Sequence, residues 1–169
     1  AMAQRYYRFE WEWSFTRNDL MIVKPHFKYR AESQKPPADN AFMIMPFDAE
    51  MADVYSKVIK PAVEEMGFKL SRGDDFFSTG EVMEDVWRRL NESAFIIADL
   101  TRRNPNVFYE LGIAHTLGKP VILLSQSIDD VPFDVRHNRV ILYSTRFSEI
   151  DSFKHQLQKS IATLREEQK

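Results

Sequence analysis

The sequence predicts an α/β protein: a parallel sheet of five strands between layers of helices, preceded by an aromatic β-hairpin. From Ala41 onward, short apolar runs alternate with amphipathic helical segments, which is the order typical of a parallel sheet with helical crossovers. Before that point, residues 5–29 alternate aromatic and polar side chains with a period of two, as a strand with one buried face does. The chain of 169 residues is long enough for one full domain with a small addition.

The N-terminal region reads as a hairpin. Aromatic side chains occupy every second position from Tyr7 to Phe15, and a return strand follows at residues 20–23 after a polar turn. A lone hairpin is marginally stable in water, so we expect this one to pack on the main domain or to pair with a second subunit. The proline-containing segment 31–40 reads as a linker, which predicts two units, 1–40 and 41–169.

The rest of the chain predicts five strands separated by helices. Strands are expected at residues 41–45, 68–70, 94–98, 120–124 and 139–143. Helices are expected at about residues 49–66, from a cap at Ser78 through Leu90, at 106–117 and at 148–166. Because crossovers between parallel strands are right-handed, these elements predict a flavodoxin-like or Rossmann-like sandwich.

Composition excludes several classes of function. The chain has no cysteine, which rules out disulfide scaffolds, thiolate metal sites and cysteine nucleophiles. Its four histidines, at positions 26, 115, 137 and 155, lack the spacing that places two imidazoles on one helical face, so no metal is expected. A net charge of −2 makes nucleic acid an unlikely partner.

Other sequence signals bear on location and cofactors. We find no apolar stretch near the ~18 residues needed to cross a bilayer and no signal-peptide pattern, so we expect a cytoplasmic protein without a membrane partner. The glycine-rich dinucleotide motif and the phosphate-loop motif are both missing. No cofactor is therefore expected.

The predicted sheet also indicates where a ligand would bind. In open α/β sheets, ligands lie beyond the carboxyl ends of the strands. This rule points to four segments: residues 46–48, 71–79, 99–106 and 125–134.

Two carboxylates stand out in these segments. Asp99 follows an apolar run, and Glu110 lies in the first turns of the next predicted helix, so we expect both to face one crevice. A helix N-terminus favours an ionised carboxylate by ~0.3–1 kcal/mol. A carboxylate beside a second acid suits glycosidic chemistry, in which one group attacks or stabilises the sugar carbon. Helix electrostatics and loop initiation would explain the same two residues without catalysis.

Residues 41–143 carry four motifs in a recognisable order. They are Met45-Pro46-Phe47, Ile97-Ala98-Asp99-Leu100-Thr101, Tyr109-Glu110-Leu111-Gly112-Ile113-Ala114 and Gly118-Lys119-Pro120-Val121. On these residues the stretch resembles the nucleoside 2-deoxyribosyltransferase-like superfamily. That superfamily also holds the 2′-deoxynucleoside 5′-phosphate N-hydrolases and borders on TIR-like domains.

The resemblance implies roles for particular residues. It implies that Glu110 is the nucleophile that takes the sugar from the base, and that Asp99 contacts the substrate. The Pro-Phe loop of the family corresponds to Pro46 and Phe47. The basic segment 101–106 is longer than in the transferases and looks more like the TIR-like branch, for which NAD or a signalling nucleotide is a plausible ligand.

Further residues at the strand ends are candidate substrate ligands. Together with Pro46 and Phe47 we include Met45, Asp75, Ser78, Thr79, Thr101, Asn106 and Asp134. Turn formation and helix capping explain several of them equally well. The guanidinium groups of Arg102 and Arg103 suit a phosphate, with solvated loop side chains as the alternative.

The sequence thus predicts an enzyme that cleaves or transfers at the N-glycosidic bond of a (deoxy)nucleoside or nucleotide. The alternatives are a TIR-like protein acting on NAD and a catalytically silent module that binds a nucleotide unaltered. We also expect a homodimer or higher oligomer, because related sites often borrow residues from a neighbouring subunit.

Overall fold

A computed structural model describes residues 39–73, 82–136, 138 and 140–167, and it shows one sheet of five parallel strands. The strand order is β2-β1-β3-β4-β5, with every neighbouring pair parallel. The strands are β1 (Asn40–Ile44), β2 (Lys69–Arg72), β3 (Phe95–Asp99), β4 (Val121–Ser125) and β5 (Val140–Leu142). This is the flavodoxin-like order, and the predicted α/β fold is confirmed.

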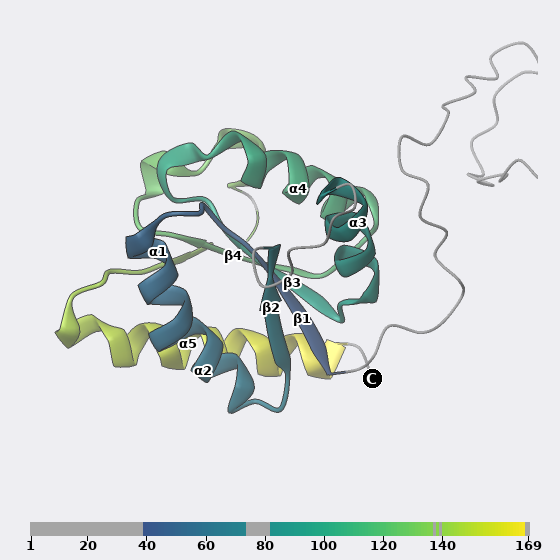
Figure 1. The fold of residues 1–169 in the computed structure, drawn as a ribbon. Helices are drawn as coiled ribbons and strands as arrows, with labels where there is room; N and C mark the ends of the chain where they lie inside the picture. Colours follow the sequence, from purple (N-terminus) through teal and green to yellow (C-terminus); the bar gives the residue numbers. More distant parts are fainter. Residues whose placement is uncertain (1–38, 74–81, 137, 139, 168–169) are drawn as a thin grey trace, which may run out of the picture.

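Helices cover both faces of the sheet (Figure 1). One face carries α1 (Ala49–Val54), η1 (Tyr55–Ile59), α2 (Lys60–Glu64) and α5 (Phe147–Glu167), and the other carries α3 (Val82–Glu92) and α4 (Pro105–Thr116). Three short 3-10 turns, η3 (Thr101–Arg103), η4 (Ile128–Asp130) and η5 (Phe133–Val135), lie in the loops after β3 and β4.

The two faces of the sheet build two separate apolar clusters. On β3, Phe95 and Ile97 join the cluster under α1, α2 and α5, whereas Ile96 and Ala98 join the cluster under α3 and α4. This is the alternation that a strand imposes on its side chains. Every residue of β3 is buried, because it is the middle strand and both of its faces are covered.

The single helix predicted for residues 49–66 is interrupted in the structure. Residues Tyr55–Ile59 form a π-helical turn between α1 and α2, and the N–H of Lys60 donates to the carbonyl of Tyr55. Pro61 follows directly, and proline cannot donate a helical hydrogen bond and clashes with the carbonyl four residues before it. A π-helical turn therefore separates α1 from α2 directly ahead of Pro61.

The predicted hairpin, the linker up to residue 38 and the division into two units lie outside the described residues and stay predictions. Within the described part, strand boundaries fall within one or two residues of those expected. No helix in this part is long and apolar enough to cross a membrane.

Two glycines near the end of α4 generate a test of the fold. Gly118 ends the helix at φ +64°, with the N–H of Lys119 donating to the carbonyl of Ala114. Gly112 lies inside the helix, and a methyl group at either position would meet nothing within 4 Å. We expect Gly118→Ala to lower the free energy of unfolding by about 1–2 kcal/mol and Gly112→Ala to raise it by up to about 1 kcal/mol. Urea denaturation measures both changes, and equal signs would contradict the assignment of the helix end.

Candidate active site

The chain leaves the carboxyl ends of β1 and β3 toward opposite faces of the sheet. After β1 it turns to α1 on one face, and after β3 it turns to α4 on the other. Open α/β sheets bind ligands at such a point. Ile44 at the end of β1 and Val107 of α4 share one apolar cluster, so α4 packs directly over this edge.

Glu110 is carried by the second turn of α4. Val107 and Leu111 on the same helix are buried in the core, which leaves Glu110 beside the buried stripe and only partly exposed. Among the described residues, none forms a hydrogen bond or ion pair with its carboxylate. Burial raises the pKa of Glu110 from an ordinary value near 4.5 to about 7. The carboxyl group therefore titrates near neutral pH, and it has no hydrogen-bond or ion-pair partner in the described part of the chain.

Asp99 has a different environment, because its side chain is completely buried. One carboxylate oxygen, Oδ1, accepts from the main-chain N–H and the hydroxyl of Thr101 at 3.0 and 2.5 Å. The other, Oδ2, accepts from the hydroxyl of Tyr143 at 2.6 Å. Burial raises the pKa of Asp99, and the hydrogen bonds from Thr101 and Tyr143 oppose that rise.

Gln126 completes the network around Asp99. Its main-chain N–H donates to the hydroxyl oxygen of Thr101 at 3.1 Å, and its side-chain amide donates to the hydroxyl oxygen of Tyr143 at 3.2 Å. Because these oxygens accept from Gln126, both hydroxyl protons remain directed at Asp99. The carboxylate thus receives three hydrogen bonds, the arrangement that suits its ionised form.

The structure separates the two acids that the sequence brought together. Asp99 lies on the face of the sheet covered by α1 and α5, since its partner Tyr143 belongs to that cluster and stacks on Phe153 of α5. Glu110 is carried by α4, on the opposite face. Strand alternation turns the Asp99 side chain toward the face opposite α4, and the expectation that both carboxylates face one crevice stays a prediction.

The turn between Asp99 and α4 holds two residues in a left-handed conformation. Arg102 and Arg103 have φ values of 64° and 51°, which non-glycine residues rarely adopt. The Arg102 guanidinium pairs with Asp48 at 2.9 Å and with Glu50, and its main-chain N–H donates to Asp130 at 2.9 Å. In this structure Arg102 therefore joins three loops of the carboxyl edge instead of presenting its guanidinium to a ligand.

A second wall of the site comes from the ends of β1 and β2. Met45 and Pro46 are buried, whereas Phe47 is 62% exposed. The guanidinium of Arg72, the last residue of β2, lies 5.8 Å from the centre of the Phe47 ring. A methyl group on Gly73 would lie 3.2 Å from the tip of that ring. The loop after β1 and the end of β2 therefore form one continuous surface.

The remaining predicted residues fall into three groups. Asn106 lies exposed in the first turn of α4, where its N–H is capped by Asn104, and Asp134 lies exposed in η5. Thr101 is buried as a ligand of Asp99. Three candidates, Asp75, Ser78 and Thr79, lie outside the described residues.

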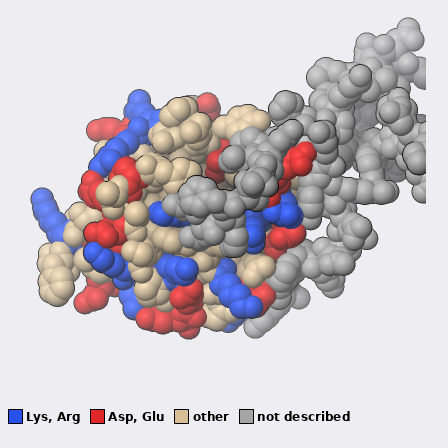
Figure 2. All heavy atoms as spheres, in the orientation of Figure 1, with Lys and Arg blue, Asp and Glu red and all other residues tan. Residues whose placement is uncertain are grey.

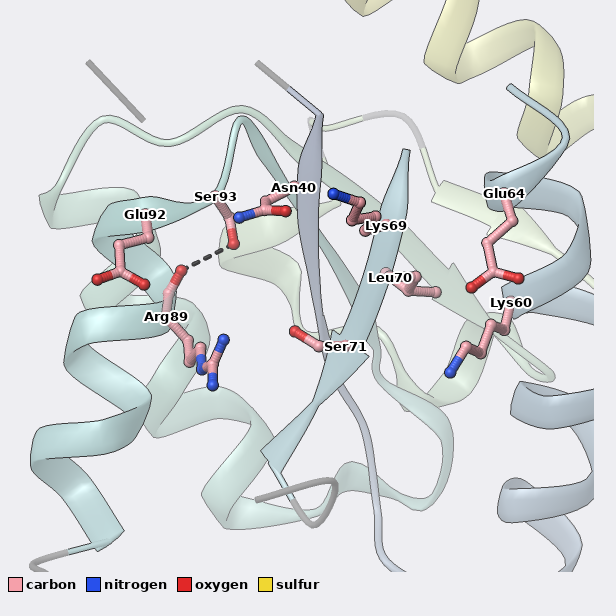
Figure 3. Close-up of a pocket in the computed structure, with 9 residues that line it drawn as sticks. All are labelled: Asn40, Lys60, Glu64, Lys69, Leu70, Ser71, Arg89, Glu92 and Ser93. Atoms are coloured by element: carbon pink, nitrogen blue, oxygen red, sulfur yellow. Dashed lines mark hydrogen bonds between the residues drawn. The ribbon is translucent and has the colours of Figure 1, made fainter. Parts of the chain in front are cut away.

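A hollow of about 530 Å³ lies elsewhere, across the edge strand β2 (Figure 3). Asn40 and Lys69 mark it as belonging to the amino ends of β1 and β2, and none of the predicted site residues lines it. Its charged groups are of both signs: Lys60, Lys69 and Arg89 with Glu64 and Glu92. We place the candidate site at the opposite edge, with Glu110.

Charge and metal-binding groups do not point to another site. Figure 2 shows acidic and basic side chains interspersed over the described surface on one face of the molecule. Within residues 39–73, 82–136, 138 and 140–167, no three His, Asp or Glu side chains gather into a group that could hold a metal ion.

Comparison with solved structures matches this fold to enzymes of nucleoside chemistry. A 2-deoxyribosyltransferase from the psychrotolerant bacterium Bacillus psychrosaccharolyticus superimposes with a TM-score of 0.51 and 16% identity, over 62% of this chain and 83% of that one. The CMP N-glycosidase BcmB of Clostridium botulinum gives a TM-score of 0.52 and 22% identity, over 74% and 99%. This chain shares the fold of the nucleoside 2-deoxyribosyltransferase-like proteins.

The other comparisons give a weaker structural match or no match. A 2-deoxyribosyltransferase from Leishmania mexicana matches with a TM-score of 0.46 and 20% identity, over 53% of this chain and 65% of that one. No family model matches the chain, and no curated protein matches its sequence.

The network around Asp99 predicts a large effect of one hydroxyl group. Tyr143→Phe removes one of the three donors and leaves a buried carboxylate oxygen without its hydrogen bond, so we expect a loss of about 1.5–3 kcal/mol in the free energy of unfolding. Tyr109→Phe is the matched control, because Tyr109 is 53% exposed and its loss should change stability by less than about 0.5 kcal/mol. Equal effects in urea denaturation would contradict the network.

The raised pKa of Glu110 predicts a pH-dependent stability difference. Its folded pKa of about 7 exceeds the ordinary value, so ionisation destabilises the fold as pH rises from about 4.5 to 7. Glu110→Gln removes this effect, and we expect it to match the wild type at pH 4.5 and to be about 1–3 kcal/mol more stable at pH 8. Thermal or urea denaturation at both pH values measures the difference. A gap independent of pH would show that Glu110 is not desolvated.

Proposed function

We propose that this protein cleaves or transfers at the N-glycosidic bond of a (deoxy)nucleoside or nucleotide, with Glu110 as the nucleophile. The observation that carries the proposal concerns the carboxyl group of Glu110 at the carboxyl edge of the sheet. This group is partly buried, and among the described residues none forms a hydrogen bond or ion pair with it. Asp48 and Glu50, by contrast, pair with the guanidinium of Arg102. The fold shared with a deoxyribosyltransferase and a CMP N-glycosidase supports the same chemistry.

The reaction follows from a carboxylate nucleophile. The Glu110 carboxylate forms a bond to the anomeric carbon of the sugar while the carbon–nitrogen bond breaks, and the electron pair of that bond leaves with the base, which is protonated. Water then attacks the same carbon and releases the free sugar, or a second base attacks and forms a new nucleoside. Glu110 regains its carboxylate in either case.

The pKa of Glu110 fits this role. A carboxyl group with a pKa of about 7 is a stronger base when ionised than an ordinary glutamate, yet a large fraction of it carries a charge at neutral pH. Substrate must bind to the ionised form, because a protonated carboxyl group has no oxygen ready to attack. Activity should therefore rise with pH through this region.

Asp99 contributes to the proposed site indirectly, through the turn that leads into α4. Its carboxylate fixes Thr101, and Thr101 starts the turn that leads through two left-handed residues into α4. In this geometry Asp99 is a positioning residue, because its side chain has no exposed surface with which to touch a substrate. Direct contact between Asp99 and the sugar, as the resemblance implies, would need this network to open.

The central test is release of free base, followed by chromatography. Wild-type protein at high concentration is incubated with deoxynucleosides, ribonucleosides, their 5′-monophosphates and NAD. We expect a nucleobase from at least one of the nucleosides or nucleotides, and Glu110→Gln should lower the rate at least ~10³-fold. Nicotinamide as the sole product would instead favour NAD as the substrate.

Controls separate loss of the nucleophile from loss of the fold. Glu64→Gln removes an exposed carboxylate at the hollow across β2 and should leave the rate unchanged. For the productive substrate, kcat/KM should increase with pH and level off above about pH 7, the pKa of Glu110. A Glu110→Gln protein that releases base as fast as the wild type would remove Glu110 from the mechanism.

A further inference from the structure

The guanidinium of Arg102 connects two segments that leave the sheet toward opposite faces. Arg102 lies in the turn between β3 and α4, whereas Asp48 caps α1 and Glu50 lies in its first turn. Nη1 of Arg102 is 2.9 Å from Oδ2 of Asp48, and Nη2 pairs with Oε2 of Glu50. Two carboxylates on one guanidinium form a network, which fixes geometry better than a single exposed ion pair does.

Asp48 is itself held in place by the helix that it caps. Its other oxygen, Oδ1, accepts from the main-chain N–H of Met51 at 3.0 Å. Met51 is completely buried in the apolar cluster under α1, α2 and α5. Through Asp48, the guanidinium of Arg102 is therefore connected to the packed core on the face of the sheet opposite α4.

The main chain of Arg102 has a conformation that its surroundings must impose. Its φ and ψ are 64° and 14°, a left-handed geometry that is costly for a residue other than glycine. Its N–H donates to Oδ2 of Asp130, in the loop after β4, at 2.9 Å. Arg103 is left-handed as well, and its guanidinium donates to the carbonyl of Asp129 in the same loop. The guanidinium of Arg102, by contrast, reaches the loop after β1.

This turn determines where α4 begins. Asn104 follows the two left-handed residues directly and caps the helix, accepting from the N–H of Asn106 at 2.9 Å. If the turn relaxed, the chain would enter α4 in another direction, and the first turns of the helix would move with it. Glu110 lies in the second of these turns. Attack on a sugar carbon needs the reacting atoms about 3–3.5 Å apart, and a displacement of about 1 Å can lower the rate about 100-fold.

We propose that Arg102 is a positioning residue for the reaction: by pairing with Asp48 and Glu50, it holds the turn before α4 and so keeps Glu110 in place for attack. This inference rests on the proposed N-glycosidic function of Glu110. Arg102 acts through the main chain of residues 102–104 and does not itself touch the substrate.

The kinetic experiment separates the side chain of Arg102 from its backbone conformation. For the productive substrate, kcat and KM are measured in Arg102→Met, Arg102→Lys and Arg102→Gly, at a temperature at which every variant is folded. We expect Arg102→Met to lower kcat about 10–100-fold with little change in KM, and Arg102→Lys to be intermediate. Glycine adopts the left-handed conformation freely, so Arg102→Gly should be as slow as Arg102→Met. A wild-type kcat in either of these two variants would overturn the proposal.

The role of the two carboxylates is tested by combining substitutions. Asp48→Asn keeps an oxygen that can cap α1 but removes the charge, and Glu50→Gln removes the second charge. Together they should lower kcat about as much as Arg102→Met does. Adding Arg102→Met to this pair should lower kcat no further, because the same contacts are already lost. Effects that simply multiply would show that Arg102 acts independently of Asp48 and Glu50, against the proposal.

Lys154→Met is the matched control. The ammonium of Lys154 pairs with Glu65 at 2.7 Å and joins α5 to the end of α2. This pair is partly exposed, as the contacts of Arg102 are, and it also joins elements far apart in the sequence. Glu65 precedes the amino end of β2, so the substitution leaves the carboxyl edge intact. Its kcat should equal that of the wild type.

Hydrogen exchange separates this proposal from the proposed function, because it needs no turnover. The N–H of Phe108 donates to the carbonyl of Asn104 across the first turn of α4. We expect the amides of residues 108–110 to exchange faster in Arg102→Met and at the wild-type rate in Lys154→Met. Unchanged exchange in Arg102→Met, or the same increase in Lys154→Met, would overturn the role of Arg102. If the wild type releases no base, the proposed function fails, and the exchange rates alone decide whether Arg102 holds this turn.

Discussion

The buried carboxylate of Asp99 is the interaction on which the rest of this edge depends. A buried charge is tolerated only when it is well satisfied, and here three donors meet it, two from Thr101 and one from Tyr143. Gln126, just after β4, orients both hydroxyl groups. Three neighbouring strand ends, those of β3, β4 and β5, are thus fixed relative to one another through one carboxyl group. The turn that leads to α4 and Glu110 starts from this fixed point.

Two carboxylates in one short segment illustrate how strongly environment divides roles. Asp99 is surrounded by donors and serves the structure, whereas Glu110 has no described partner and its pKa is raised to about 7 by burial. A well-satisfied carboxylate gains stability at the expense of reactivity, since its oxygens are already engaged. The poorly satisfied one keeps its oxygens available and destabilises the fold when ionised. A buried polar group that lacks partners and therefore lowers stability is typical of functional positions.

The sequence was sufficient to predict the sheet, its parallel sense and the position of Glu110 on a helix, because each depends on local periodicity. The sequence did not predict the face of the sheet on which the Asp99 side chain lies. The last residue of a strand can point either way until the register and the covering helices are known. Tyr143 and Gln126 escaped notice for a related reason: their roles come from strands brought together only by the fold. Pro61, by contrast, was a visible signal within the helix expected at residues 49–66, and the π-helical turn before it is its consequence.

The two kinds of polar contact at this edge differ in their access to water. Asp99 and its donors are enclosed, but the Arg102 side chain and its partners Asp48 and Glu50 are between one third and about one half exposed. Dissolved salt screens accessible charges much more than enclosed ones. Raising the ionic strength should therefore loosen the loops after β1 and β3 from each other while leaving the base of the site intact. Arg102 and Arg103 would then be able to leave their left-handed conformations. The ionic strength of the solution would thus change the conformation of the loops around the candidate site.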